Sequence, residues 1–425
     1  LQDAMRGREV YYDELSLYAG GAGILLYYLS LYRATGKDDY LNEVRGAADY
    51  LASRIESGER TLPRSFSAWA FSSGFSGAAF SLLRAYAQLN VPRYAHAASL
   101  IIEETIAEGR ERLAKRRSGK ADTDASLFLW SSYPGIVGDA GTLLFLLEAG
   151  KQLRNKDWTA FAIDAGYEYL KEAHPYAAGG YYYDGVDPAY FHAGADYIDP
   201  NFPMGTAGVG YLLLRLFEAS GDEAFLRATD GIITFHEQVA VSDGDAALLP
   251  HGLPDRRNLF YLGYCHGPAG TCRYYYLLHR LTGDTNAYDW CFRLAEGSRR
   301  AGAPALHSPG YWNVYNRCCG LAGILELFLG LWSAYGRDED LAFAEQTGRQ
   351  LLSVSSRLQE GDVPTLRWYM ALDRIAPEVV TSPVGLYDGA AGIGEALLSL
   401  ALAKEGRFFA ERVVDDPFPS GIQIK

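Results

Sequence analysis

The 425-residue sequence has little of what several classes of protein require. It contains only 5 cysteines, too few for a disulfide framework in a chain of this length. No basic block offsets the net charge of −13, which excludes the usual electrostatic footprint of a nucleic-acid partner. Its apolar stretches are interrupted well before the roughly 20 residues of a membrane span, and its first residues form no apolar signal region. We therefore expect a cytoplasmic protein without a membrane span.

A short motif, Gly-x-(Ala/Ser)-Gly, recurs along the whole chain. An apolar run long enough for a helix follows each copy, and a more charged run that begins with acids usually comes next. Such periodicity is typical of a repeat architecture, and no low-complexity linker interrupts it. We predict an all-α fold, an (α/α)7 toroid of seven helix-pair repeats with inner and outer helix rings, and a single domain over residues 1–425. The first glycines of the motifs are Gly20, Gly74, Gly138, Gly205, Gly267, Gly320 and Gly389.

The seven motifs should lie at the same end of the ring, because each begins an inner helix, and helix N-termini together favour a binding site there. The residues just before the first glycines should then surround the opening. These are Ala19, Ser73, Val137, Met204, His266, Cys319 and Asp388.

Two neighbouring motifs carry thiols, Cys265 in the fifth repeat and Cys318 with Cys319 in the sixth. Three convergent thiolates suit Zn²⁺ and leave one coordination position open. The sequence therefore predicts one Zn²⁺ held by these three residues. The alternative is that they are ordinary buried thiols, as we expect for Cys272 and Cys291 inside helix patterns.

At these residues the sequence resembles the lanthionine synthetase C-like family. The resemblance extends over nearly the whole chain and is most specific at residues 264–270 and 318–323. It implies a seven-repeat (α/α) toroid with a single zinc, to which Cys265 supplies one ligand and Cys318 and Cys319 supply two. The last ligand is usually a histidine in the family, whereas Cys319 resembles the three-cysteine cyclase domains of some bifunctional lanthipeptide synthetases. Residues 255–258, which include Arg257, resemble the eukaryotic members.

The cyclases of this family add a cysteine thiol of a peptide to dehydroalanine or dehydrobutyrine and so form a thioether. The resemblance implies that the metal lowers the thiol pKa and that an acid protonates the resulting enolate. Two groups expected from the cyclases are missing. Met204 stands where the fourth repeat of the cyclases has histidine, and Pro134 stands where the third repeat has aspartate, so neither side chain can transfer a proton.

Several side chains could take over the missing proton transfer. His266 stands at the predicted opening, and His251 and His307 lie in the loops that lead into the two thiol motifs. We predict these three as catalytic residues, although each could instead have a structural or solvated role. Further candidates are His192, Asp139 and Asp388.

The segment from Gly179 to Pro203 is rich in Tyr, Asp and Pro and runs directly into the fourth motif. It is predicted either as a lid over the site or as an ordinary packed connection. The predicted substrate-binding residues are Tyr183, Asp184, Met204, Arg257 and Asp388.

Three functions are compatible with these features. The first is a zinc-dependent enzyme that adds a thiol to a dehydroamino acid in a peptide, with a separate dehydratase as a partner. The second is a stand-alone zinc protein that binds glutathione or another small thiol without cyclase activity. The third is a carbohydrate-active toroid that uses two carboxylates and no metal, against which the three thiols argue.

Overall fold

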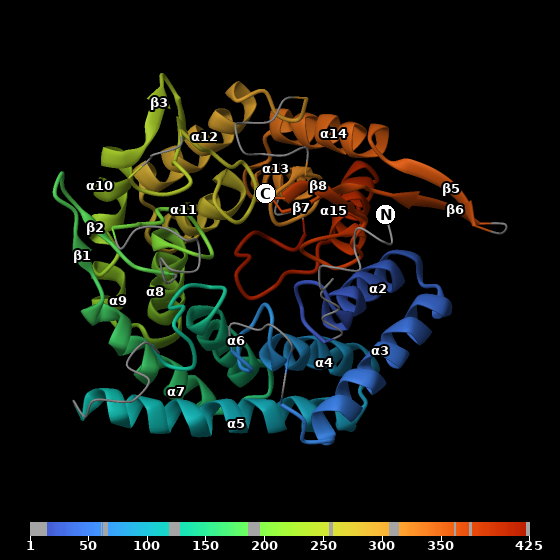
Figure 1. Ribbon diagram of the computed structural model, residues 1–425, viewed down its shortest axis with the longest axis horizontal. Helices are drawn as coiled ribbons and strands as arrows, with labels where there is room; N and C mark the ends of the chain where they lie inside the picture. The colour runs from blue at the N-terminus through green and yellow to red at the C-terminus, as the bar shows by residue number, and fades with distance from the viewer. Residues whose placement is uncertain are drawn as a thin grey trace.

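The computed structural model describes residues 15–60, 62, 67–118, 128–185, 196–254, 258–305, 314–360, 363–373 and 376–421, and its helices form two concentric rings (Figure 1). One inner helix follows each of the seven motifs, and the last inner helix contacts the first, which closes the ring. The predicted (α/α)7 toroid is confirmed. The inner helices are α2 (Gly21–Thr35), α4 (Phe75–Leu89), α6 (Asp139–Gln152), α8 (Thr206–Ser220), α11 (Pro268–Thr282), α13 (Leu321–Tyr335) and α15 (Ala390–Lys404).

The outer ring packs against the inner one, helix by helix. The outer helix of the fourth repeat is divided in two at Ala228 and Thr229, and the Ala228 carbonyl oxygen accepts a hydrogen bond from the Tyr183 hydroxyl at 2.7 Å. Within the described residues 405–421, no outer helix follows α15. The outer helices are α3 (Asp38–Glu56), α5 (Pro92–Arg117), α7 (Lys156–Gly166), α9 (Glu223–Arg227), α10 (Asp230–Val239), α12 (Thr285–Arg300) and α14 (Asp338–Ser353).

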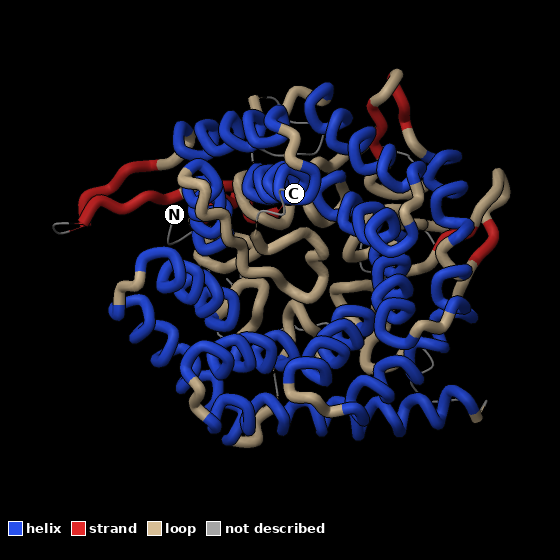
Figure 2. Tube along the Cα trace, turned by 180° about the vertical axis from the view of Figure 1, so that it is seen from behind, coloured by secondary structure: helices blue, strands red, loops and turns tan. Residues whose placement is uncertain are grey.

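The described residues include four antiparallel hairpins, and the β5–β6 hairpin projects from the body of the molecule (Figure 2). A 3-10 helix, η1 (Tyr167–Lys171), follows α7. No described helix has both the length and the apolar character needed to cross a bilayer. The strand pairs are β1 (His174–Pro175) with β2 (Tyr181–Tyr182), β3 (Val241–Asp243) with β4 (Ala246–Leu248), β5 (Ser356–Glu360) with β6 (Val363–Arg367), and β7 (Met370–Asp373) with β8 (Ala376–Thr381).

Close packing of the backbone, rather than a special turn conformation, explains the glycines of the motif. The first glycine caps the inner helix with negative φ, from −104° to −151°, so the helix begins inside the motif. In six repeats, a Cβ on the second glycine would lie 1.9 to 2.3 Å from a backbone carbonyl oxygen of the preceding loop. Any side chain at that position would force the loop away from its helix.

The Gly77→Ala variant tests this explanation. The new Cβ would meet the Phe71 carbonyl oxygen at 2.2 Å, so we expect the free energy of unfolding to fall by about 1–3 kcal/mol, as for other overpacked sites. Gly208→Ala is the matched control, because its Cβ would lie 3.0 Å from the Ile136 side chain and would meet backbone atoms only at the ordinary contact distance of 3.4 Å, at Pro203. Urea unfolding of both variants measures the difference. Equal losses would contradict the explanation.

Candidate metal centre

The loops before the inner helices meet at one end of the ring and are joined by backbone hydrogen bonds. The Cys318 N–H donates to the Tyr387 carbonyl oxygen at 2.9 Å, and the Tyr387 N–H donates to that of Tyr18 at 2.9 Å. The Tyr18 N–H donates in turn to the Ser72 carbonyl oxygen, also at 2.9 Å. Each of these residues stands two positions before the first glycine of its motif. Equivalent positions of neighbouring repeats are therefore held side by side.

The fifth and sixth loops are joined in the same way and carry the thiols. The N–H groups of Tyr264 and Cys265 both donate to the Cys318 carbonyl oxygen, at 2.7 and 3.1 Å. The two loops lie so close that a Cβ on Gly263 would be 2.5 Å from the carbonyl carbon of Cys319. This contact requires glycine at position 263.

The three thiols converge as the repeat register predicts. The Cys265 and Cys319 sulfur atoms are 3.2 Å apart, those of Cys319 and Cys318 are 3.6 Å apart, and all three lie within 4.8 Å of one another. Zn–S bonds of about 2.3 Å in a tetrahedron place sulfur atoms about 3.8 Å apart, so the donor set fits Zn²⁺ with one position open. Cys265 and Cys318 are buried, whereas Cys319 is partly exposed.

The surroundings of Cys318 favour its thiolate. Hydrogen bonds from the thiols of Cys265 and Cys319, and then from the Tyr18 hydroxyl, lower the pKa of Cys318 well below its usual value despite burial. The nearby His266 contributes in the same direction. Burial and the neighbouring Cys318 raise the pKa of Tyr18, which stays a neutral hydrogen-bond donor. Because metals bind the thiolate form, this environment suits Cys318 to metal binding.

A buried histidine–aspartate pair lies beside the thiols. The Nδ1 atom of His266 is 2.9 Å from an oxygen of Asp199, and their side chains are only 4% and 1% exposed. The His251 ring stacks on His266 with 4.0 Å between centroids, and Tyr261 contacts the His266 ring edge-on at 5.7 Å. The His266 ring is thus fixed by three neighbours, and Nε2 is the nitrogen that does not face Asp199. The structure brings together two of the predicted catalytic residues, His266 and His251.

His236 of α10 holds the segment that carries Asp199. Its Nε2–H donates to the Pro200 carbonyl oxygen at 2.8 Å, so Nδ1 accepts from the Tyr275 hydroxyl at 2.7 Å. Both ring nitrogens are thus satisfied in the neutral form, and burial lowers the pKa of His236 to about 4. The role of His236 is therefore structural.

This histidine should make stability depend on pH. The unfolded chain takes up a proton on His236 near pH 6.5, whereas the folded chain resists protonation until about pH 4. Stability is therefore present above pH 6.5 and lost as the pH falls toward 4, by up to about 3 kcal/mol. Urea unfolding at several pH values should show this loss in the wild type and less of it in His236→Gln. Parallel pH profiles for the two proteins would be inconsistent with the assignment.

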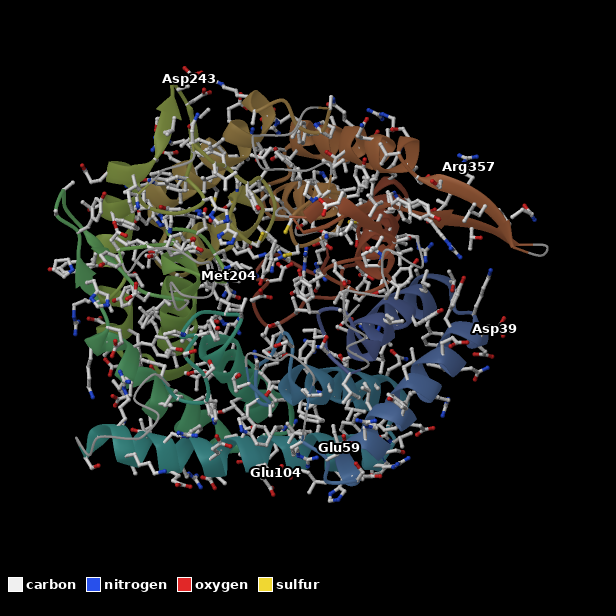
Figure 3. All side chains as sticks on the ribbon, in the orientation of Figure 1. Asp39, Glu59, Glu104, Met204, Asp243 and Arg357 are labelled. Atoms are coloured by element: carbon white, nitrogen blue, oxygen red, sulfur yellow. The ribbon has the colours of Figure 1, made fainter. Side chains whose placement is uncertain are left out.

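Two of the predicted substrate-binding residues lie at the opening. Met204 directly precedes the α8 N-cap, on the inner side of the ring (Figure 3). The carbonyl oxygen of Asp388 accepts a hydrogen bond from Asn316 at 3.3 Å, and the Asn316 side chain accepts from the Cys319 N–H at 2.8 Å. Asp388 also lies near enough to Tyr18 to raise its pKa. Arg257, His307 and His192 lie outside the described residues.

The first part of the predicted lid packs between the outer ring and the fourth motif, where the Tyr183 N–H donates to the Thr206 hydroxyl at 3.2 Å. The β1–β2 hairpin packs on α10 of the outer ring, and Tyr183 is buried there with its hydroxyl on the Ala228 carbonyl oxygen. Asp184 lies 3.3 Å from His174. These contacts give Tyr183 a packing role and leave the predicted substrate contacts of both residues without support. Within the described residues of the segment, Asp199 contacts His266, and Gly185 packs against the backbone of Met204.

Asp139 is also structural. It accepts hydrogen bonds from the N–H groups of Leu129 and Trp130 and from the Ser131 hydroxyl, and burial raises its pKa to about 7. These contacts attach the loop at residues 128–131 to α6.

Sequence reasoning did not identify Asp199 or Tyr18. A signal existed for Tyr18, because it has the same position in the first repeat as Cys265 and Cys318 have in theirs. Asp199 had no such signal, because it lies 67 residues before its partner His266 and outside the motif.

Comparisons with known proteins agree with this geometry. The model of the family "Lanthionine synthetase C-like protein" matches residues 11–111 and 204–410, and the second stretch contains all three clustered thiols. No curated protein matches the sequence. Nisin cyclase is similar in structure, with a TM-score of 0.69 and 17% identity over 95% of this chain and 92% of that one. The Lin0763 protein of Listeria innocua has a TM-score of 0.50 and 12% identity over 86% of this chain and 98% of that one.

Proposed function

The chain belongs to the lanthionine synthetase C-like family, and we propose that it is an enzyme that adds a thiol to a dehydroamino acid, with one Zn²⁺ held by Cys265, Cys318 and Cys319. The observation that carries this proposal is the convergence of the three thiols at the end of the ring where the seven loops meet. The substrate is a peptide that contains a cysteine and a dehydroalanine or dehydrobutyrine, made by a separate dehydratase. A cytoplasmic location, which would keep the thiols reduced, stays a prediction.

The chemistry needs an activated thiol and a proton donor. Bound Zn²⁺ supplies Lewis acidity, which lowers the pKa of a thiol in the open position. In the overall reaction the substrate sulfur bonds to the β-carbon of the alkene, the thiol loses its proton, and the α-carbon gains one. Cys265, Cys318 and Cys319 would hold the metal, and a substrate thiol would approach beside Cys319, the partly exposed member of the three.

His266 is the residue that moves the proton in this proposal. Asp199 faces Nδ1, and the stacked His251 fixes the plane of the ring, so the proposal assigns the proton transfer to the other ring nitrogen, Nε2. This pair takes the place of the histidine and aspartate that Met204 and Pro134 replace. Its rigidity suits an acid–base group, which must be held within hydrogen-bond reach of the reacting atom.

A second function has one observation in its favour. Met204 lies at the opening and cannot exchange a proton, which favours a protein that binds a small thiol such as glutathione and does not cyclise a peptide. The family match gives no support to the third alternative, a carbohydrate-active enzyme.

A dehydrated peptide with one free cysteine distinguishes the first two functions. Ring closure within the peptide leaves its mass unchanged and protects the cysteine from alkylation. Addition of glutathione in the same mixture raises the mass by one glutathione and leaves the cysteine open to alkylation. If neither product forms above the rate without protein, the proposed enzyme activity is wrong.

A further inference from the structure

After α15 the chain enters the centre of the ring. The repeat pattern would instead place an outer helix after this inner helix. Residues 405–421, the C-terminal segment, cross the space enclosed by the inner helices (Figures 1 and 2). Pro417 and Pro419 are incompatible with a regular helix there. Val413, Val414 and Phe418 of the segment are buried. The segment is therefore part of the core of the toroid.

This segment is attached to five inner helices. It supplies a carboxylate, a backbone carbonyl oxygen and two aromatic rings to residues that lie far from it in the sequence. These contacts are Glu411 with Arg33 of α2 and Arg84 of α4, Val414 with Tyr211 of α8, Phe418 with Tyr276 of α11, and Phe408 with Trp332 of α13.

One side chain of the segment reaches a thiol loop. Asp415, 1% exposed, accepts a hydrogen bond from the hydroxyl of Tyr264, the residue next to Cys265. Arg273 of α11 fixes both partners, because its guanidinium lies 4.7 Å from the Tyr264 ring centre and 3.4 Å from an Asp415 oxygen. A buried carboxylate with two such partners holds Tyr264 in one place.

The same contact extends to the other thiol loop. The Tyr264 ring packs against Tyr387 at 5.4 Å between centroids, and Tyr387 stacks on Tyr18, which hydrogen-bonds Cys318. Arg317, the residue before Cys318, lies 5.1 Å from the Tyr387 ring centre. Tyr264, Tyr387 and Tyr18 thus form a row. Both ends of the row reach the thiol cluster, because Tyr264 is next to Cys265 in the chain and Tyr18 hydrogen-bonds Cys318.

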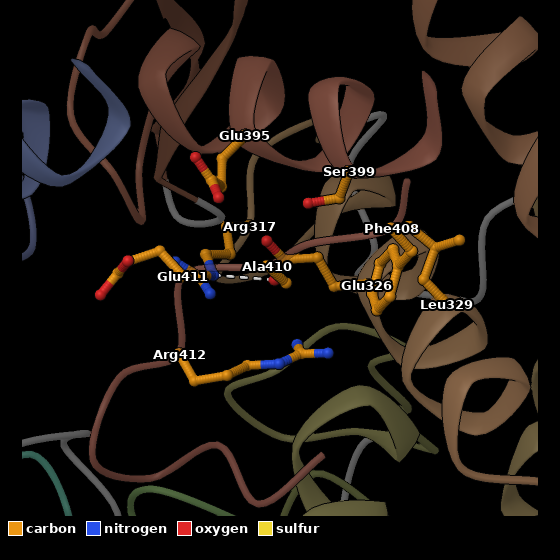
Figure 4. Close-up of a pocket in the computed structure, with 9 residues that line it drawn as sticks. All are labelled: Arg317, Glu326, Leu329, Glu395, Ser399, Phe408, Ala410, Glu411 and Arg412. Atoms are coloured by element: carbon orange, nitrogen blue, oxygen red, sulfur yellow. Dashed lines mark hydrogen bonds and ion pairs between the residues drawn. The ribbon is translucent and has the colours of Figure 1, made fainter. Parts of the chain in front are cut away.

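Charged side chains from the C-terminal segment and the inner helices also meet in a small pocket beside this row (Figure 4). Arg317 pairs there with Glu326 of α13 at 2.8 Å, and Glu411 and Arg412 of the segment line the same pocket with Glu395 of α15. Displacing the segment would leave these buried charges without their partners, which is costly. The segment and the thiol loops therefore share one charged core.

We propose that Asp415 is a positioning residue of the metal centre and that docking of the C-terminal segment is thermodynamically coupled to metal binding at the three thiols. The coupling runs from Asp415 through the Tyr264 hydroxyl to the backbone of Cys265. It rests on the proposed function in assuming that the thiols hold a metal. Coupling of this kind is reciprocal, so the metal must also stabilise the docked segment.

The Tyr264→Phe variant tests one direction of the coupling, since it removes the hydroxyl and keeps the ring. We expect its affinity for Zn²⁺, measured by competition with a chromogenic chelator, to be about 10-fold weaker, as for other residues that orient metal ligands. Tyr211→Phe is the matched control. Tyr211→Phe also removes a buried tyrosine hydroxyl that hydrogen-bonds the segment, in this case at the Val414 carbonyl oxygen. Tyr211 lies within α8, however, and neither thiol loop precedes that helix.

Asp415→Ala and the double variant Asp415→Ala/Tyr264→Phe complete a double-mutant cycle of Zn²⁺ affinities. If the two residues act through one bond, Tyr264→Phe weakens Zn²⁺ binding no further in the Asp415→Ala protein. Equal Zn²⁺ affinities for the Tyr264→Phe and Tyr211→Phe proteins would overturn the proposal, as would additive losses in the cycle.

Hydrogen exchange tests the other direction. Removal of Zn²⁺ from the full-length protein should speed amide exchange in residues 405–421 while leaving the outer helix α3 unchanged. Exchange that is the same with and without Zn²⁺ in the segment overturns the coupling. A wild-type protein that binds no Zn²⁺ refutes the proposed function itself, and this inference with it. One that binds Zn²⁺ but shows no effect of Tyr264→Phe refutes only the coupling.

Discussion

Replacement of Cys265, Cys318 or Cys319 by alanine should leave the purified protein without stoichiometric metal. Structural zinc sites are worth about 10–16 kcal/mol, so the loss of one ligand in four weakens binding by about 10²–10³-fold. Addition of a thiol to a dehydrated peptide should be lost together with the metal. Elemental analysis of the purified variants, combined with the peptide assay, measures both effects.

The two remaining cysteines provide matched controls. Cys272 of α11 and Cys291 of α12 are also buried and free, but each thiol contacts the backbone carbonyl oxygen of the other residue, at 3.5 and 3.8 Å. Burial raises the pKa of both thiols, as expected for inert core residues. Their alanine variants should keep one metal per chain. A metal that survives all three cluster replacements, or that depends on Cys272, would rule out the proposed site.

The His266→Gln variant should keep its metal and lose most of its rate. Removal of an acid–base group typically slows a reaction by about 10²–10⁴-fold, and glutamine cannot exchange the proton. Asp199→Asn should slow the reaction less, because the imidazole remains and only its fixed orientation is lost. Single-turnover rates with the dehydrated peptide, together with metal content, separate catalysis from ligand binding.

His279 supplies the control for this experiment. It is a partly buried histidine of α11 whose Nδ1 atom contacts the Asp284 carbonyl oxygen at 3.0 Å, on the helix turn farthest from the thiol loops. His279→Gln should leave the rate unchanged. If His266→Gln retains the wild-type rate with its metal bound, another group transfers the proton, and His251 is the next residue to replace.

The repeat pattern of the sequence was sufficient to predict the rings and the place of the thiols. Each motif is local: a glycine cap, a second glycine against a carbonyl oxygen, and an apolar helix. Seven similar units can bury their apolar faces only by packing side by side, so residues at equivalent positions must meet. For that reason, Cys265 and Cys318 could be placed together although 53 residues separate them. The same register also places Met204, His266 and Asp388 at the opening.

Residues outside the motif could not be placed in this way. The Gly179–Pro203 segment has no counterpart in the other repeats, and packing on α10 determined that Tyr183 is buried there while Asp199 reaches the site. The destination of the C-terminal segment was equally hidden, since its prolines exclude a helix but do not indicate where the chain goes.

The sequence by itself thus determined the architecture, the three thiols that converge and the end of the ring at which they lie, because short-range periodicity dictates these features. Only the tertiary structure decided which groups surround these thiols: Asp199 beside His266, Tyr18 hydrogen-bonded to Cys318, and Asp415 hydrogen-bonded to Tyr264. Each of these contacts joins residues from unrelated parts of the chain. Such pairs form where packed elements bring buried polar groups within bonding distance, and no local pattern encodes that distance.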